Sequence, residues 1–110
     1  MVTINGRTFK SLNFTVLRDK LERKEKKQTY RCAFVPKYGI GELIAITYNN
    51  EFLYFANITE IYPRKLGEIT LEEAKMDGFE SIEEFQKTIK KLNGVKDPDQ
   101  WGFIIRFNPV

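Results

Sequence analysis

The order of the sheet-forming and helix-forming segments most strongly constrains the fold of this chain. Three runs rich in β-branched and aromatic residues, at positions 29–35, 42–48 and 52–62, are typical of β-strands. Two stretches with helix-capping signals follow, and an apolar run at 101–107 adds a last strand. The runs are too continuous for a sheet with one solvated face, so we expect strands buried on both faces of a packed or closed sheet. At the start of the chain, Asn5-Gly6 favours a tight turn because both residues tolerate positive φ, and we expect a short hairpin or an extended arm there.

Two helices are predicted between residue 70 and the last strand. Thr70 with Glu73, and Ser81 with Glu84, fit the pattern in which a hydroxyl residue and a glutamate three positions later cap the first turn of a helix. Pro63 is expected to end the strand that precedes them. The order of segments indicates an α+β domain whose sheet can curl into a small barrel.

A further helix is predicted from Phe14, because Phe14, Leu17 and Leu21 recur at helical spacing. No apolar residue follows until Tyr30. We therefore expect the second half of this helix, residues 21–28, to be exposed to solvent or to contact something polar.

The composition limits the chemistry that the chain can perform. Its 110 residues contain one cysteine and no histidine, which leaves few preferred ligands for a structural zinc ion and excludes Ser-His-Asp and Cys-His nucleophilic machinery. A general base would have to be a carboxylate, a lysine or the terminal amine. We expect no metal and no cofactor. With neither a secretory signal nor an apolar run long enough for a membrane span, we expect a cytoplasmic monomer without membrane contact.

Two segments carry a resemblance to a known family. A basic segment ends in the pattern K-x-x-T-x-R at residues 26–31, and EEAKMDGFESIEEF occupies residues 72–85. Together with the strand that follows Gly41 and the last strand, these segments resemble the ASCH domain over about residues 17–107. The resemblance implies that residues 1–110 form a single ASCH-like domain of the α+β class, with a small PUA-like β-barrel and flanking α-helices.

The same resemblance implies candidate site residues. The family signature, similar to G-x-K-x-x-T-x-R, places Lys26, Thr29 and Arg31 on the motif, although Lys24 stands where the family usually has glycine. Some stand-alone members of the family are amidohydrolases that remove an acetyl group from cytidine with a lysine, a threonine and a glutamate. Lys26 and Thr29 fall on the first two of these positions, and Asp77 falls on the third with a side chain one methylene shorter.

The distribution of charge gives independent information on a binding surface. Residues 18–27 contain six cationic and three acidic side chains, and this local excess equals the net charge of +3 of the whole chain. Such a concentration is typical of a surface that contacts phosphates. The alternative interpretation is a solvated helix end, because Glu22 and Lys26 have the spacing of a helix-stabilising pair. Both interpretations stay open.

Three functions are therefore predicted. The first is an RNA-binding or nucleotide-ligand-binding module with a basic cleft. Its predicted residues are cations for phosphate, a threonine for a polar contact and a tyrosine for stacking: Lys24, Lys26, Lys27, Arg31, Thr29 and Tyr30. The alternative is a metal-independent amidohydrolase acting on acetylated cytidine through Lys26, Thr29 and Asp77. The second alternative is a protein-interaction module that uses the same exposed segment.

Overall fold

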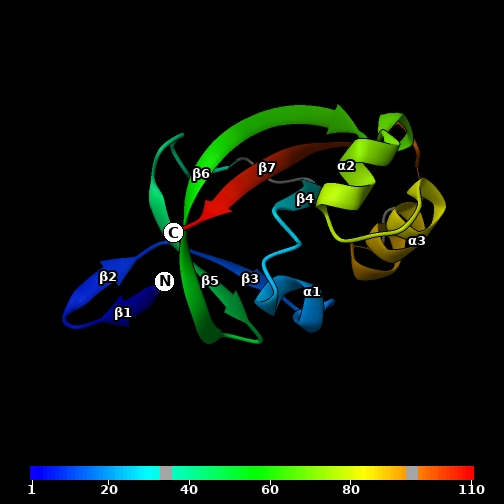
Figure 1. The fold of residues 1–110 in the computed structure, drawn as a ribbon. Helices are drawn as coiled ribbons and strands as arrows, with labels where there is room; N and C mark the ends of the chain where they lie inside the picture. The colour runs from blue at the N-terminus through cyan, green and yellow to red at the C-terminus, as the bar shows by residue number, and fades with distance from the viewer. Residues whose placement is uncertain (33–35, 94–96) are drawn as a thin grey trace.

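The computed structural model describes residues 1–32, 36–93 and 97–110 (Figure 1). In this part of the chain, a five-stranded mixed sheet has the strand order β3-β5-β6-β7-β4, and β1 and β2 pair as a separate hairpin. β3 and β5 are parallel, and the other neighbours are antiparallel. The elements, in chain order, are β1 (Val2–Ile4), β2 (Arg7–Phe9), β3 (Ser11–Phe14), α1 (Arg18–Glu22), β4 (Gln28–Cys32), β5 (Leu43–Tyr48), β6 (Glu51–Lys65), the 3-10 turn η1 (Leu66–Glu68), α2 (Leu71–Met76), α3 (Ile82–Asn93) and β7 (Trp101–Pro109).

Two buried clusters lie on opposite faces of the sheet, as the consecutive residues Ile104 and Ile105 of β7 demonstrate. Neighbouring residues of a strand point to opposite faces, and these two belong to different clusters. The first cluster contains Leu12, Phe14, Leu21, Ile44, Ile46, Ala56, Ile58, Ile105 and Phe107. The second contains Tyr30, Leu66, Ile69, Ala74, Phe79, Phe85, Ile89 and Ile104. The continuous apolar runs predicted strands with both faces buried, and the structure confirms this for the middle of β7.

The local turn and capping predictions are confirmed. Asn5 and Gly6 have φ values of 51° and 77° between β1 and β2, as a two-residue hairpin turn requires. At the start of α2, the Glu73 N–H donates to the Thr70 hydroxyl at 3.2 Å, and the Thr70 N–H donates to the Glu73 carboxylate at 2.9 Å. At α3, half of the pattern is present: the Glu84 N–H donates to the Ser81 hydroxyl at 3.1 Å, whereas the Glu84 carboxylate accepts from the Glu80 N–H at 3.3 Å. No helix of the described residues is long and apolar enough to cross a membrane.

The predicted end of the third strand at Pro63 is wrong. β6 continues to Lys65, and Pro63 lies opposite Phe103 of β7. β5 pairs with β6 only up to Asn57, so the later part of β6 has one described strand neighbour. Proline is tolerated there because its nitrogen, which carries no hydrogen, can face the unpaired edge. The first predicted strand, 29–35, is observed as β4 from Gln28, and residues 33–35 lie outside the described residues.

The predicted helix from Phe14 through the basic segment is also wrong. Phe14 ends β3, and α1 contains five residues, Arg18–Glu22. Leu17 and Lys24, with φ values of 59° and 61°, adopt left-handed backbone conformations that interrupt a right-handed helix on both sides. The chain therefore turns after α1 and directs Lys26, which is only 3% exposed, into the interior.

The backbone ladder of the described strands has two free edges, β3 and β4, and does not close into a barrel. A side chain connects the two edges instead. Arg31 of β4 donates through Nη2 to the backbone carbonyl oxygen of Asn13 in β3 at 2.7 Å. We call the gap between these edges the β3–β4 seam, and the candidate site lies beside it.

Candidate ligand-binding site

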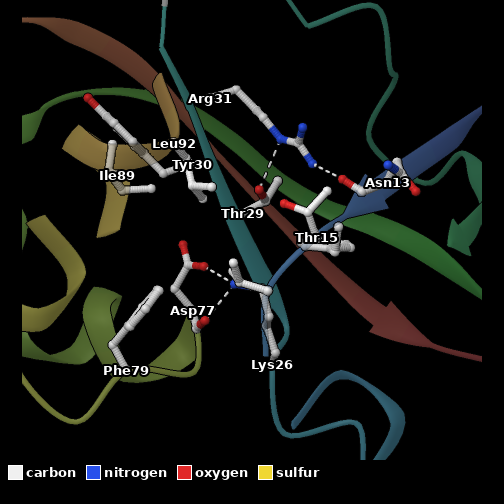
Figure 2. A pocket seen from close by; sticks show the side chains of 12 residues that line it. Asn13, Thr15, Lys26, Thr29, Tyr30, Arg31, Asp77, Phe79, Ile89 and Leu92 are labelled. Carbon is white, nitrogen blue, oxygen red and sulfur yellow. Dashed lines mark hydrogen bonds and ion pairs between the residues drawn. The ribbon is translucent and has the colours of Figure 1, made fainter. Parts of the chain in front are cut away.

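A cavity of about 270 Å³ lies beside the β3–β4 seam (Figure 2). Residues of β3 and β4 form one side, and residues of α3 and the α2–α3 connection form the other. Five of the sequence-predicted site residues line it, and two, Lys24 and Lys27, do not. The lining residues are Asn13, Phe14, Thr15, Val16, Lys26, Thr29, Tyr30, Arg31, Asp77, Phe79, Ile89 and Leu92.

Lys26 and Asp77 form a buried ion pair in the wall of this cavity. The Lys26 ammonium contacts the Asp77 carboxylate and also donates to the Asp77 backbone carbonyl oxygen at 2.6 Å. Both side chains are 3% exposed. The ammonium lies between two aromatic rings, 5.3 Å from the centroid of Phe14 and 5.4 Å from that of Phe79. The pair and the two rings together hold the lysine in one position.

The end of α2 sets the position of Asp77. Asp77 caps the C-terminus of α2, and Gly78 follows with a φ of 93°. This left-handed conformation favours glycine. A Cβ atom on Gly78 would also lie 3.1 Å from Leu17 Cδ1 and 3.6 Å from Lys26 Cβ. The glycine therefore lets the chain turn sharply and pass close to the segment that carries Lys26.

Gln28 is a polar residue of this site that the sequence reasoning missed. It is fully buried, and its side-chain amide donates to the Asp77 carboxylate at 3.2 Å and to the Glu73 carbonyl oxygen at 2.9 Å. Its amide oxygen accepts a hydrogen bond from Arg106 Nε at 3.1 Å. A glutamine beside a run of charged residues gives no pattern by which burial could be recognised, because its partners are distant in the sequence.

Burial has a different effect on the two charged groups nearest the cavity. It raises the pKa of Asp77, and the nearby Lys26, Gln28 and Arg31 oppose this rise. It lowers the pKa of Arg31, which nevertheless stays protonated, as arginine does throughout proteins. The cavity is thus lined both by the Asp77 carboxyl group, whose proton affinity is increased, and by Arg31, which is permanently cationic.

Arg31 and Thr29 point to the same face of β4 and contact each other. Arg31 Nε donates to the Thr29 hydroxyl oxygen at 3.0 Å, and Figure 2 shows the guanidinium between Thr29 and Asn13. Within the described part of the chain, these contacts use two of the five N–H donors of Arg31. Arg31 also lines the cavity, so its guanidinium lies at the surface that a bound ligand would contact.

The structure gives Tyr30 a different role from the predicted stacking. Its ring is 3% exposed and packs edge-on against Phe85, with centroids 5.8 Å apart. Its hydroxyl donates to the Arg64 carbonyl oxygen at 2.9 Å. Tyr30 is therefore a buried core residue that also lines the cavity.

The basic segment does not form a single patch. Lys24 Nζ lies 5.3 Å from the ring centroid of Tyr54. Lys27 borders a separate surface depression formed with α2. Because Lys26 is buried and paired with Asp77, the local excess of charge found in the sequence is divided among three locations. Lys24 and Lys27, which were predicted to bind phosphate together with Lys26 and Arg31, therefore lie outside the cavity.

No protein-family model matches this sequence, and no curated protein matches it. Solved structures do match the fold. An ASCH domain from Lactobacillus crispatus JV V101 superimposes with a TM-score of 0.76 at 14% identity, over 93% of this chain and 79% of that one. Protein EF3133 from Enterococcus faecalis V583, of family DUF984, superimposes with a TM-score of 0.63 at 15% identity, over 84% of this chain and 68% of that one. Hypothetical protein PH0355 superimposes with a TM-score of 0.64 at 15% identity, over 91% of this chain and 99% of that one. The chain therefore has an ASCH-like fold, as the resemblance of its motifs predicted.

Proposed function

We propose that the protein binds a nucleoside-sized ligand in the cavity beside the β3–β4 seam, either as a free nucleotide or as an unpaired base of RNA. The residue composition of the cavity wall supports this proposal. The rings of Phe14 and Phe79 lie beside the polar groups of Thr29 and Arg31. Pockets for small molecules typically combine apolar and aromatic walls with a few convergent polar groups.

The size of the cavity favours a small ligand. Its volume of about 270 Å³ lies just below the range of about 300 to 1,000 Å³ that is typical of drug-sized ligands. One base or nucleoside suits this volume better than a folded nucleic acid. RNA-binding domains also commonly take single unstacked bases into pockets, so a free nucleotide and an RNA base share the same chemistry here.

Arg31 supports recognition of an anionic or carbonyl-bearing ligand. It is a partly desolvated cation at the cavity, and its remaining donors can bind a phosphate or a base carbonyl oxygen in a fixed geometry. Lys26 was predicted to contact phosphate, but its ammonium is already bound to Asp77. We therefore assign ligand binding to Arg31 and Thr29, and the support of the cavity wall to Lys26.

Calorimetric titration with nucleoside monophosphates and with a short unstructured oligoribonucleotide tests this proposal. Wild type should bind at least one of these ligands, and Arg31→Gln should weaken that binding. Lys75→Gln, which removes an exposed lysine of α2 outside the cavity, is the matched control and should bind like wild type. Absence of binding by wild type to every probe would reject the proposal.

Amide hydrolysis is a second candidate function, favoured by one specific observation. Lys26, Thr29 and Asp77, which the resemblance to amidohydrolases implicates, line the same cavity. Asp77 has a raised pKa because it is buried, which suits a group that carries a proton. The assay for this candidate is hydrolysis of acetylated cytidine.

A further inference from the structure

The sheet face that carries Thr29 and Arg31 continues beyond the cavity along β7 and β6. Directly paired residues of antiparallel strands point to the same face. Arg31 is paired with Phe103, Phe103 with Pro63, and Trp101 with Lys65. Figure 1 shows β6 and β7 as two long strands that lie side by side. We call Pro63, Lys65, Trp101 and Phe103 the aromatic strip.

Among the described residues of this face, those of the aromatic strip belong to neither buried cluster. Ile105 and Phe107 point to the same side of β7 and are buried in the first cluster. Phe103 is half-buried, and Trp101 at the end of the strand is 55% exposed. Exposed tryptophan is unusual because burial of its large ring is strongly favourable. Arg31, opposite Phe103, joins the strip directly to the cavity.

The strip also carries positive charge. Lys65 Nζ lies 5.4 Å from the centroid of the Trp101 ring, and none of the four strip residues is acidic. An apolar protein surface would remove water from this ammonium without compensating its charge. A polynucleotide offers both matching groups, because its bases stack on aromatic rings and its phosphates neutralise lysine.

We propose that the aromatic strip binds the nucleotides that flank the base held in the cavity, so that the ligand is single-stranded RNA and not only a free nucleotide. This inference rests on the proposed function. Arg31 lies between the two parts and contacts the phosphate that connects them. Phe103 and Trp101, two residues apart on one strand and so about 6.6 Å apart, each present a ring to a separate base.

Trp101 allows a direct test, since it is the one tryptophan of the sequence. A short unstructured oligoribonucleotide should change its fluorescence and bind more tightly than any nucleoside monophosphate. Trp101→Ala should weaken oligonucleotide binding roughly 5- to 150-fold, as expected for the loss of one base–aromatic stack, and leave mononucleotide binding unchanged. Trp101→Phe should retain most of the affinity. Lys65→Gln should reduce the salt slope by about 0.7, whereas the control Lys75→Gln should bind like wild type.

The outcomes separate this inference from the proposed function. Equal affinity of wild type and Trp101→Ala for the oligonucleotide would overturn the inference, and mononucleotide binding would still support the cavity. Oligonucleotide binding that depends on Trp101 without any mononucleotide binding would support the strip and reject the cavity as an independent site. A change in sedimentation of Trp101→Ala without a change in RNA affinity would overturn the inference and assign the strip to contact between two copies of the chain.

Discussion

Lys26 donates both to the carboxylate and to the backbone carbonyl oxygen of Asp77, a residue 51 positions away in the sequence. One ammonium therefore fixes the side chain and the main chain of the residue that ends α2. Because Lys26 lies beside β3 and β4, this contact attaches the helical part of the molecule to the β3–β4 seam. The position of the cavity wall depends on this pair, whether or not the lysine takes part in chemistry.

Lys26→Ala should destabilise the protein by about 3 to 5 kcal/mol, because removal of one partner of a buried ion pair leaves an uncompensated charge. The free energy of unfolding from urea denaturation at neutral pH gives the measurement. Lys75→Ala, which truncates an exposed lysine, is the control and should change stability by less than about 0.5 kcal/mol.

The pH dependence of this variant identifies the charge responsible. Without Lys26, one of the groups that opposes the burial-driven rise in the pKa of Asp77 is lost, and this pKa should rise further. A group with a raised folded-state pKa loses stability as pH increases through that pKa. Lys26→Ala should therefore be less destabilised near about pH 5 than near about pH 8. An equal loss at both values would mean that packing, and not the Asp77 charge, explains the effect.

Glu73 should show the opposite pH dependence. Burial favours its protonated form, but hydrogen bonds from Tyr62, the Thr70 N–H and Arg64 outweigh burial and hold its pKa below the usual value. Its contribution to stability is present above the unfolded-state pKa, about 4.3, and is lost as pH falls through the folded-state pKa. The stability difference between wild type and Glu73→Gln should therefore decrease on acidification. Urea denaturation at several pH values measures it, and a difference that grows on acidification would contradict the assignment.

Gly78→Ala should destabilise the protein by more than about 1 kcal/mol, because alanine is strained at a positive φ. The added Cβ would also press on Leu17, 3.1 Å away. Thermal unfolding measures the loss. Gly39→Ala is the matched control, since the nearest atom to its added Cβ lies 3.9 Å away and its φ is not in the left-handed range. Similar losses of stability in both variants would contradict the assignment of the effect to the left-handed conformation of Gly78.

The sequence predicted those parts of the fold that depend on neighbouring residues. The cap formed by Thr70 and Glu73 and the turn at Asn5-Gly6 each involve groups within a few positions of one another. The helix predicted from Phe14 failed because Leu17 and Lys24 adopt left-handed conformations, which nothing in their side chains favours. Apolar spacing alone could not distinguish a short helix after a strand from one long helix.

The candidate site was also predicted only in part, because some of its contacts join residues that are distant in the sequence. The resemblance to a family motif selected Lys26, Thr29 and Asp77, which the fold brings to one cavity. Gln28 was missed, because its bonds to Asp77 and Arg106 join residues 49 and 78 positions apart. The exposed strip around Trp101 was also missed, since its composition depends on the register between β6 and β7, and that register includes Pro63 as a strand residue.

Hydrolysis of acetylated cytidine should be slow or absent in wild type. The Lys26 ammonium is bound twice by Asp77, and the Thr29 hydroxyl oxygen accepts a hydrogen bond from Arg31. Among the hydrogen bonds of the described residues, none joins Lys26 to Thr29, so the lysine is not placed to activate the hydroxyl. A nucleophile needs a base within hydrogen-bond reach. Chromatography measures product formation. A parallel measurement of binding distinguishes a site that binds the nucleoside without hydrolysing it from a site that does not bind it.

Two variants determine which residue limits the reaction. Asp77→Glu lengthens the carboxylate by one methylene, which can move Lys26 toward Thr29 and the ligand. A gain of turnover in Asp77→Glu would show that the cavity holds the required groups and that the short carboxylate keeps them apart. Lys26→Ala in the Asp77→Glu background should then remove the gain, because Lys26 is the one lysine among the described residues that line the cavity. Rapid turnover by wild type that Lys26→Ala abolishes would instead make amide hydrolysis the function of this cavity, with ligand binding as its first step.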